Sequence, residues 1–246
     1  MSRLVYVCVI SLPFVLYYIW KVEYIEKHEY NYSELERYQF AQRMITIMKH
    51  NGRIKTDVFG TENLPDEGGY VMYSNHQGKY DTLGIMSVHE KPCTVMMDEE
   101  RSHLILADQF MTLLKGCRID KKTMKTQMKA ILSVTAEVKS GRRYIIFPEG
   151  GYCENKNDVN RFLPGSFKCA MKAERPIVPV AIIDSYKPFG VNSLRKVTTQ
   201  VHFLPPLYYE DYKDMTTHEV ADLVRCMIID TIQVQLSQNE KKQSCA

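Results

Sequence analysis

The stretch YVMYSNHQGKYD, residues 70–81, begins with an apolar run typical of a buried strand and ends in a polar turn. His76 and Asp81 lie five residues apart in this turn. A carboxylate can accept a hydrogen bond from one ring nitrogen of a histidine and hold the other nitrogen toward a hydroxyl group. The spacing therefore predicts a general base, His76, oriented by Asp81. The alternative interpretation is a surface histidine followed by an aspartate that caps the next helix.

A second apolar run leads into Phe147-Pro148-Glu149-Gly150. Strand and helix signals alternate along the chain, which predicts an α/β fold with a mainly parallel central sheet flanked by helices. Chemistry in such sheets collects at the carboxyl ends of strands, where both His76 and Glu149 fall. The predicted strands are 53–59, 70–74, 93–97, 143–147, 177–183 and 198–204, and the predicted helices are 80–89, 104–114, 122–139, 166–173 and 217–237.

The N-terminal part predicts membrane attachment. Residues 4–20 contain no charged side chain and, as one helix, would reach about 26 Å, the short limit for a bilayer span. Pro13 can kink this helix, which also permits a tilted or re-entrant anchor. Residues 21–33 are interpreted as a linker, and 34–50 have the periodicity of an amphipathic helix. We therefore expect N-terminal membrane-anchor and amphipathic helices over residues 1–50 and a catalytic domain over 51–246.

Composition narrows the class of partner. The 246 residues are 45% hydrophobic and 25% charged, as in a globular protein, and a net charge of +3 is too small to indicate nucleic acid. Basic residues nevertheless gather between Lys115 and Arg143, which indicates either an anionic partner or a solvated helix face. The seven cysteines contain no C-x2-C pair, so no metal site is expected.

Four segments now stand in order: NHQGKYD (75–81), GCRIDK (116–121), FPEGG (147–151) and IVPVAI (177–182). Together with the apolar N-terminus they resemble the glycerolipid acyltransferases, and most closely the 1-acyl-glycerol-3-phosphate (lysophosphatidate) acyltransferases. The resemblance extends from about residue 53 to residue 207.

The resemblance implies an acyl transfer from a thioester to the free hydroxyl of lysophosphatidate, without an acyl-enzyme. His76 would be the general base and Asp81 its partner. The third segment would bind the acceptor, the fourth would line the acyl site, and Lys121 or Arg118 would hold the acceptor phosphate. The implied substrate-binding residues are Asn75, Arg118, Lys121, Phe147, Pro148, Glu149, Gly150, Gly151 and Pro179.

The resemblance also implies the partners. Acyl-CoA or acyl carrier protein would serve as a co-substrate, with no bound cofactor, and membrane lipids would surround the enzyme. In a bacterium we expect the inner membrane, with the active site facing the cytoplasm; in a eukaryote we expect an internal membrane.

Two departures from the family pattern bear on the acceptor. Lys121 stands where the family usually has an arginine, and Gly151-Tyr152-Cys153 stands where Thr-Arg-Ser is usual. Lysine binds phosphate without the bidentate fork of arginine. The acceptor can therefore be another lysolipid or glycerol-3-phosphate. A further alternative is a non-catalytic protein that binds anionic membranes. Candidates for the missing phosphate contact are Lys156, Arg161 and Lys168.

Overall fold

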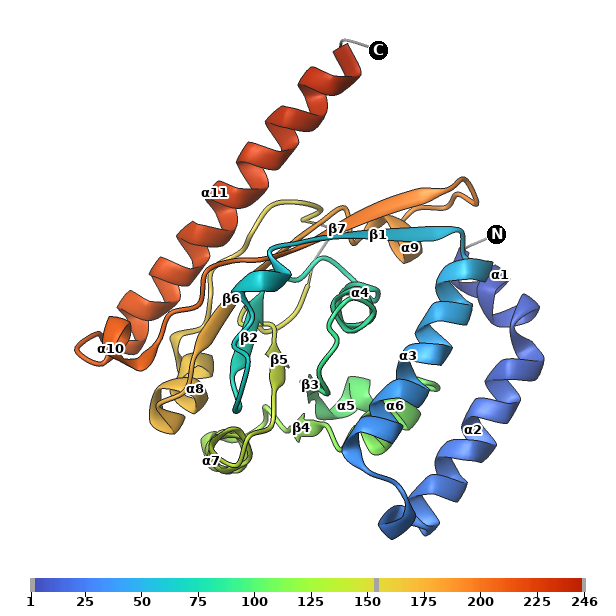
Figure 1. The fold of residues 1–246 in the computed structure, drawn as a ribbon, viewed down its shortest axis with the longest axis horizontal. Coiled ribbons are helices and arrows are strands. Elements are labelled where there is room, and N and C mark those ends of the chain that lie inside the picture. Colours follow the sequence, from blue (N-terminus) through green and yellow to red (C-terminus); the bar gives the residue numbers. More distant parts are fainter. Residues whose placement is uncertain (1–2, 153–154, 245–246) are drawn as a thin grey trace.

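A seven-stranded sheet forms the centre of the computed structural model (Figure 1), which describes residues 3–152 and 155–244, with side chains up to residue 239. The strand order is β1-β7-β6-β2-β5-β3-β4. Five neighbouring pairs are parallel and only β6–β7 is antiparallel. The strands are β1 (Ile54–Phe59), β2 (Val71–Ser74), β3 (Thr94–Asp98), β4 (Cys117–Ile119), β5 (Tyr144–Ile146), β6 (Ile177–Ile183) and β7 (Val197–Phe203). The α/β prediction is confirmed as a mixed, mainly parallel sheet.

Helices cover both faces of this sheet (Figure 1), with α3, α4 and α6 on one side and α7, α8 and α11 on the other. The helices are α1 (Arg3–Ile10), α2 (Leu12–Lys27), α3 (Glu34–Asn51), α4 (Asp81–Met86), α5 (Glu99–Ser102), α6 (Ala107–Leu113), α7 (Met124–Lys139), α8 (Lys168–Ala173), α9 (Lys187–Gly190), α10 (Tyr209–Tyr212) and α11 (Thr217–Ser244). β4, α5, α9 and α10 were not predicted, because three or four residues are too few to show a periodicity.

The central strands supply side chains to two separate cores. In β2, Met72 belongs to the core under α2, α3, α4 and α6, whereas Val71 and Tyr73 belong to the core under α7, α8 and α11. Successive side chains of a strand point to opposite faces, so a strand covered on both sides must be apolar throughout. This explains why β6 is buried along its whole length, IVPVAII.

The apolar N-terminus forms two helices instead of the single predicted one. α1 and α2 meet at Ser11 with a bend of 75°. Pro13 lies in the first turn of α2, where its ring prevents a continuous helix from residue 9 onward. No single helix in the described part of the chain is long and apolar enough to cross a membrane; only the bent pair passes that test, by length and composition. The anchor therefore stays a prediction.

The linker predicted over residues 21–33 is wrong in its first half, because α2 continues to Lys27. Val22 and Ile25 are buried in the core that β2 shares with α3, and this packing stabilises the helix beyond its apolar segment. At the other end of the chain, α11 continues to Ser244, past the predicted residue 237.

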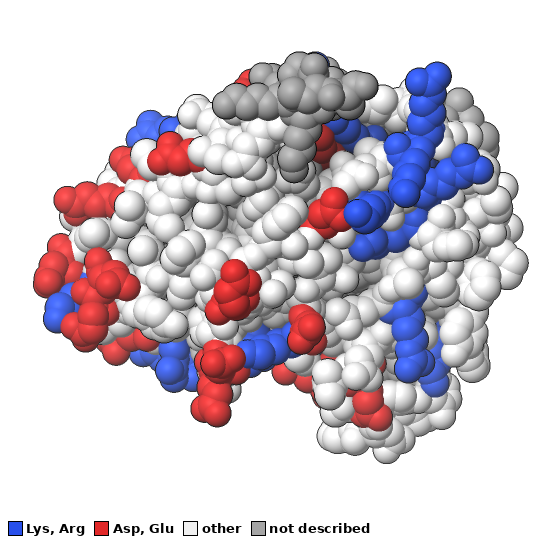
Figure 2. All heavy atoms as spheres, turned by 45° about the horizontal axis from the view of Figure 1, so that its top comes forward, with Lys and Arg blue, Asp and Glu red and all other residues white. Residues whose placement is uncertain are grey.

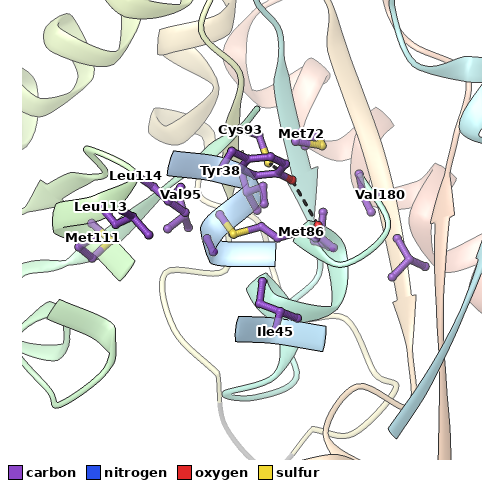
Figure 3. Close-up of a cluster of buried hydrophobic side chains, with 14 of the residues drawn as sticks. Tyr38, Ile45, Met72, Met86, Cys93, Val95, Met111, Leu113, Leu114 and Val180 are labelled. Atoms are coloured by element: carbon purple, nitrogen blue, oxygen red, sulfur yellow. Dashed lines mark hydrogen bonds between the residues drawn. The ribbon is translucent and has the colours of Figure 1, made fainter. Parts of the chain in front are cut away.

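α3 packs directly on the sheet core (Figure 3). It begins with a capping box in which Ser33 accepts a hydrogen bond from the Glu36 backbone and Glu36 accepts one from the Ser33 backbone. The buried hydroxyl of Tyr38 then donates to the carbonyl oxygens of His89, at 2.9 Å, and Met86, at 3.3 Å. α2 and α3 therefore share one core with the sheet, and the division at residue 50 stays a prediction.

Candidate active site

Three parallel strands bring the candidate site together. β2 lies between β5 and β6 and is parallel to both, so the three carboxyl ends reach the same edge of the sheet. His76 follows β2, Glu149 follows β5 and Ser185 follows β6. This edge is where an open α/β sheet leaves a crevice for ligands.

His76 and Asp81 form a hydrogen-bonded pair. Nδ1 of His76 lies 2.6 Å from Oδ2 of Asp81. The Asp81 side chain is fully buried, whereas 16% of the His76 side chain is exposed. Because a carboxylate only accepts, Nδ1 is the donor, and in the neutral ring Nε2 then carries the lone pair. The geometry of this pair is that of a histidine prepared to accept a proton from a hydroxyl group.

Asp81 receives three further donors. The backbone N–H of Gln77 and of Gly78, the latter at 2.8 Å, donate to Oδ2, and the Ser185 hydroxyl donates to Oδ1 at 2.6 Å. Burying a carboxylate without such donors would greatly lower the free energy of unfolding, because the charge would lose its hydration without replacement. Ser185 lies 104 residues from Asp81, so sequence analysis missed it; no local motif marks a residue whose role depends on the neighbouring strand.

Aromatic rings hold the imidazole from two sides. Phe147 stacks on the His76 ring, with centroids 4.3 Å apart, and Tyr152 meets it edge-on at 4.6 Å. The Arg101 guanidinium lies over the Tyr152 ring, 5.2 Å from its centroid. Arg101 also escaped sequence analysis, because it comes from the unpredicted helix α5. Arg101 therefore places a cation over the aromatic ring that contacts the candidate base.

Glu149 ties together the loops around the site. Its Oε1 accepts from the His76 backbone N–H at 2.7 Å, and its Oε2 accepts from the Asn160 side chain at 2.7 Å. Burial raises the pKa of the Glu149 carboxyl group, against the opposing effect of these hydrogen bonds. Both oxygens are engaged within the protein, so in this structure Glu149 fixes the backbone of the candidate base. Its predicted contact with an acceptor is untested.

Asn75 and Pro179 lie inside the protein. The buried Asn75 side chain donates to the Ile182 carbonyl at 3.0 Å and accepts from the Ile182 N–H at 2.9 Å, so it locks the loop after β2 to β6. Pro179 is buried in β6 beside Tyr73. The expectation that β6 lines an acyl site stays a prediction.

The two predicted phosphate-binding residues, Lys121 and Arg118, have different partners in the structure. Lys121 Nζ donates to the Gly150 carbonyl at 2.7 Å and lies 3.2 Å from Asp98. Its ammonium group is therefore at the FPEGG turn. Arg118 is paired with Asp108 at 2.7 Å and donates to the Ser102 hydroxyl. Of these two, Lys121 is the one held at the turn next to Phe147 and Tyr152.

The FPEGG turn itself depends on glycine. Gly150 has φ +74°, a left-handed conformation that glycine adopts without strain, and a Cβ there would meet Leu163 at 2.8 Å. Pro148 is buried, and its carbonyl accepts from the Leu163 N–H. Gly151 is partly exposed with open space around its Cα. Cys153 lies outside the described residues.

Within residues 3–152 and 155–244, no group of three or more His, Cys, Asp or Glu side chains is arranged so that it could bind a metal ion.

Comparison with known proteins places this geometry in context. A family model described as Acyltransferase matches residues 55–183, just over half of the chain. The 1-acyl-sn-glycerol-3-phosphate acyltransferase alpha of Homo sapiens is 29% identical over 198 residues, covering 78% of this chain and 68% of the relative. The 1-acyl-sn-glycerol-3-phosphate acyltransferase of Salmonella typhimurium is 24% identical over 162 residues, covering 65% of this chain and 66% of the relative.

A solved structure has the same fold. The crystal structure of the 1-acyl-sn-glycerophosphate (LPA) acyltransferase PlsC from Thermotoga maritima superposes with a TM-score of 0.74 at 19% identity, covering 95% of this chain and 94% of that one.

Proposed function

This chain belongs to the acyltransferase family, and on that premise we propose that it moves a fatty acyl group from an acyl thioester to the free hydroxyl of lysophosphatidate, forming phosphatidate. The names of the relatives support the acceptor. The observation that carries the reaction is the His76–Asp81 pair, with Nδ1 bound to a buried carboxylate and Nε2 available as a base.

In the proposed step, Nε2 of His76 takes the proton of the acceptor hydroxyl as its oxygen attacks the thioester carbonyl carbon. The carbon–sulfur bond then breaks, and the proton leaves with the sulfur as a free thiol. An alcohol is a poor nucleophile at neutral pH, and general-base help contributes roughly 10²–10⁴ in rate. The substrate supplies the attacking oxygen, so the step needs no acyl-enzyme.

Two cations support a phosphate-bearing acceptor. Lys121 is held at the FPEGG turn, and Arg101 lies over Tyr152, whose ring contacts His76. In lysophosphatidate the free hydroxyl and the phosphate are only a few bonds apart. A phosphate between Lys121 and Arg101 would therefore keep the hydroxyl near the base. We assign Arg101 the guanidinium contact for which Lys156, Arg161 and Lys168 were the sequence candidates.

Acyl-CoA or acyl carrier protein acts as co-substrate and no cofactor stays bound. Phe147 and the β6 segment around Pro179 contact the substrates. The enzyme is attached to a membrane through α1 and α2, and in a bacterium its site faces the cytoplasm, where thioesters are made.

Replacement of His76 tests the proposal. Purified wild-type protein should form phosphatidate from lysophosphatidate and acyl-CoA, or acyl carrier protein thioester. His76→Ala should lower kcat/KM by at least about 10²-fold, because the general base is gone. The exposed His50 provides the matched control, and His50→Ala should keep full activity. A fully active His76→Ala protein would rule out the mechanism.

A different acceptor is the second candidate, favoured by Lys121 and by the missing arginine after Gly150. A panel of lysophosphatidate, other lysolipids and glycerol-3-phosphate, with one donor, decides between them, since one acceptor should dominate kcat/KM.

A further inference from the structure

Asp98, the last residue of β3, contacts both of the segments that carry the cations of the candidate active site. Its Oδ1 accepts from the backbone N–H groups of Glu100, at 3.2 Å, and Arg101, at 3.3 Å, and so caps the start of α5. Its Oδ2 lies 3.2 Å from Nζ of Lys121. One carboxylate therefore holds the start of the helix that carries Arg101 and also the ammonium group of Lys121.

The order of the strands brings these groups together. β3 and β4 are parallel neighbours at one end of the sheet, and Asp98 is paired in register with Ile119. Lys121 follows β4 and therefore leaves the sheet beside the start of α5. Its ammonium group then reaches the carbonyl oxygen of Gly150 in the FPEGG turn. Asp98 thus lies directly behind the two cations between which the proposed function places the acceptor phosphate.

The charges of the two cations are compensated to different degrees. Asp98 is an ion-pair partner of Lys121, whereas the exposed Arg101 makes no ion pair with a carboxylate among residues 3–152 and 155–239. Burial raises the pKa of the Asp98 carboxyl group, but the hydrogen bonds from Lys121 and from the α5 backbone outweigh this effect, so the pKa lies below its ordinary value. Asp98 is therefore an anion at neutral pH, and the three side chains together carry a single net positive charge.

The field of the whole protein adds little to this local charge. The chain has a net charge of only +3, and the face in Figure 2 carries acidic as well as basic side chains instead of one continuous positive surface. Exposed charges more than about 8–10 Å apart are also largely screened at physiological salt. A phosphate bound at Lys121 and Arg101 would therefore interact chiefly with the charged groups beside it, and Asp98 is one of these groups.

We propose that Asp98 is a specificity-determining residue, which sets the preference of the site for the charge of the acceptor headgroup. Its carboxylate holds Lys121 and the start of α5 in place, and its negative charge opposes the second charge of a phosphate monoester. A monoester carries about −1.5 to −2 at pH 7, whereas a phosphodiester carries a single negative charge. The proposal rests on the proposed function in placing the acceptor phosphate between Lys121 and Arg101.

Two substitutions separate the charge of Asp98 from its place in the fold. Asn caps a helix about as well as Asp, so Asp98→Asn should leave α5 and Arg101 in position while it removes the charge. Asp98→Ala removes the charge and the cap together. Both variants should show the same change in acceptor preference, but Asp98→Ala should have the lower kcat/KM for every acceptor, because Arg101 is then held less firmly.

Asp57 provides the matched control. It pairs with Lys55 at 2.7 Å, and its side chain is 34% exposed, against 24% for Asp98. It lies in β1, however, at the end of the sheet opposite to β3 and β4. Asp57→Asn therefore removes one negative charge and one Asp–Lys ion pair at a distance from the candidate site.

The test uses two acceptors that differ by one charge, lysophosphatidate and its phosphate methyl ester. Initial rates with one acyl donor give kcat/KM for each acceptor at pH 8, where the monoester is almost fully doubly charged. In the full-length Asp98→Asn protein, the ratio of kcat/KM for lysophosphatidate to that for the methyl ester should rise at least about threefold over wild type, because a nearby unit charge no longer opposes the dianion. In Asp57→Asn the ratio should stay within about 1.5-fold of wild type.

An unchanged ratio in Asp98→Asn would overturn the proposal, even if kcat/KM fell equally for both acceptors, since Asp98 would then only hold Lys121 in place. An equal rise in Asp57→Asn would also overturn it, because the effect would belong to the net charge of the protein. Equal kcat/KM values in Asp98→Asn and Asp98→Ala would exclude the positioning of α5 from the role of Asp98.

Failure of the proposed function would give a different result. If wild type transfers no acyl group to either acceptor, that function is wrong. Equilibrium binding of the same two acceptors to wild type, Asp98→Asn and Asp57→Asn then decides the role of Asp98, since the ratio of the two Kd values should change as the ratio of rates would. If neither acceptor binds to wild type, the role of Asp98 is overturned as well.

Discussion

Asp81 organises the candidate site at the scale of single residues. Its buried carboxylate accepts from His76 and from two backbone N–H groups on Oδ2, while Oδ1 has Ser185 as its hydrogen-bond donor. Ser185 also donates its backbone N–H to the Gln77 side chain at 2.8 Å. The end of β6 is therefore part of the support for the catalytic pair, and Ser185 is a positioning residue.

Removal of the Ser185 hydroxyl should affect catalysis more than binding. A hydrogen bond to a charged group contributes about 1.5–3 kcal/mol, so Ser185→Ala should lower kcat roughly tenfold to a hundredfold with little change in KM. Without this hydrogen bond the Asp81 carboxylate, and the imidazole that it orients, would be held less firmly.

Ser185→Thr, which keeps a hydroxyl, should recover most of the lost kcat. A Ser185→Ala protein with an unchanged kcat and reduced folding stability would instead assign Ser185 a purely structural role.

At the scale of elements, α3 connects the N-terminal helices to the sheet. Its start is determined by local chemistry, the reciprocal Ser33 and Glu36 capping box, and its burial by Tyr38, Ala41 and Ile45. The hydrogen bonds from Ser33 lower the pKa of Glu36. Because Tyr38, Ala41 and Ile45 belong to the core that α3 shares with the sheet, the helix and the sheet should unfold together.

Loss of the cap should destabilise the whole protein. Ser33→Ala should lower the free energy of unfolding by about 1 kcal/mol, the usual cost of removing a capping hydroxyl. Urea denaturation followed by circular dichroism measures this. Ser133→Ala, an exposed change in the middle of α7, should stay within a few tenths of a kcal/mol. If α3 alone melts and the sheet transition does not move, α3 is not part of the common core.

At the scale of the whole molecule, a buried histidine links stability to pH. His89 is fully buried; its Nδ1 donates to the Lys91 carbonyl at 2.7 Å and its Nε2 accepts from the Tyr70 hydroxyl at 2.7 Å. This arrangement requires the neutral ring. Burial lowers the pKa of His89 to about 4. The unfolded chain, with an ordinary histidine pKa near 6.5, binds the proton earlier.

The contribution of His89 to stability is complete above about pH 6.5 and is lost as the pH falls toward 4, with a total on the order of 3 kcal/mol. Urea denaturation at several pH values should show this decline. The His89→Gln protein should have a lower free energy of unfolding at pH 7. Its free energy of unfolding should also fall less steeply as the pH decreases, and the slopes of the two proteins should differ by up to about 1.4 kcal/mol per pH unit. Equal slopes in the two proteins would show that His89 does not carry the effect.

Many structural features of this protein can be predicted from local patterns in the sequence. The alternation of strands and helices, the capping box at Thr216 and Glu219, and the His76–Asp81 spacing are local properties of the chain. Side chains a few residues apart have a separation set by backbone geometry, so the sequence alone determined the fold class and brought the candidate base to its carboxylate.

The tertiary structure decided what depends on distant partners. Ser185 and Arg101 acquire their neighbours only through the order of the strands, which no local periodicity encodes. The basic segment 115–143 illustrates the converse, since ion pairs with carboxylates such as Glu29, Glu34 and Asp108 engage five of its nine basic side chains. Charge and hydrogen bonding act over a few ångströms in space, and the sequence alone does not say which residues the fold brings that close.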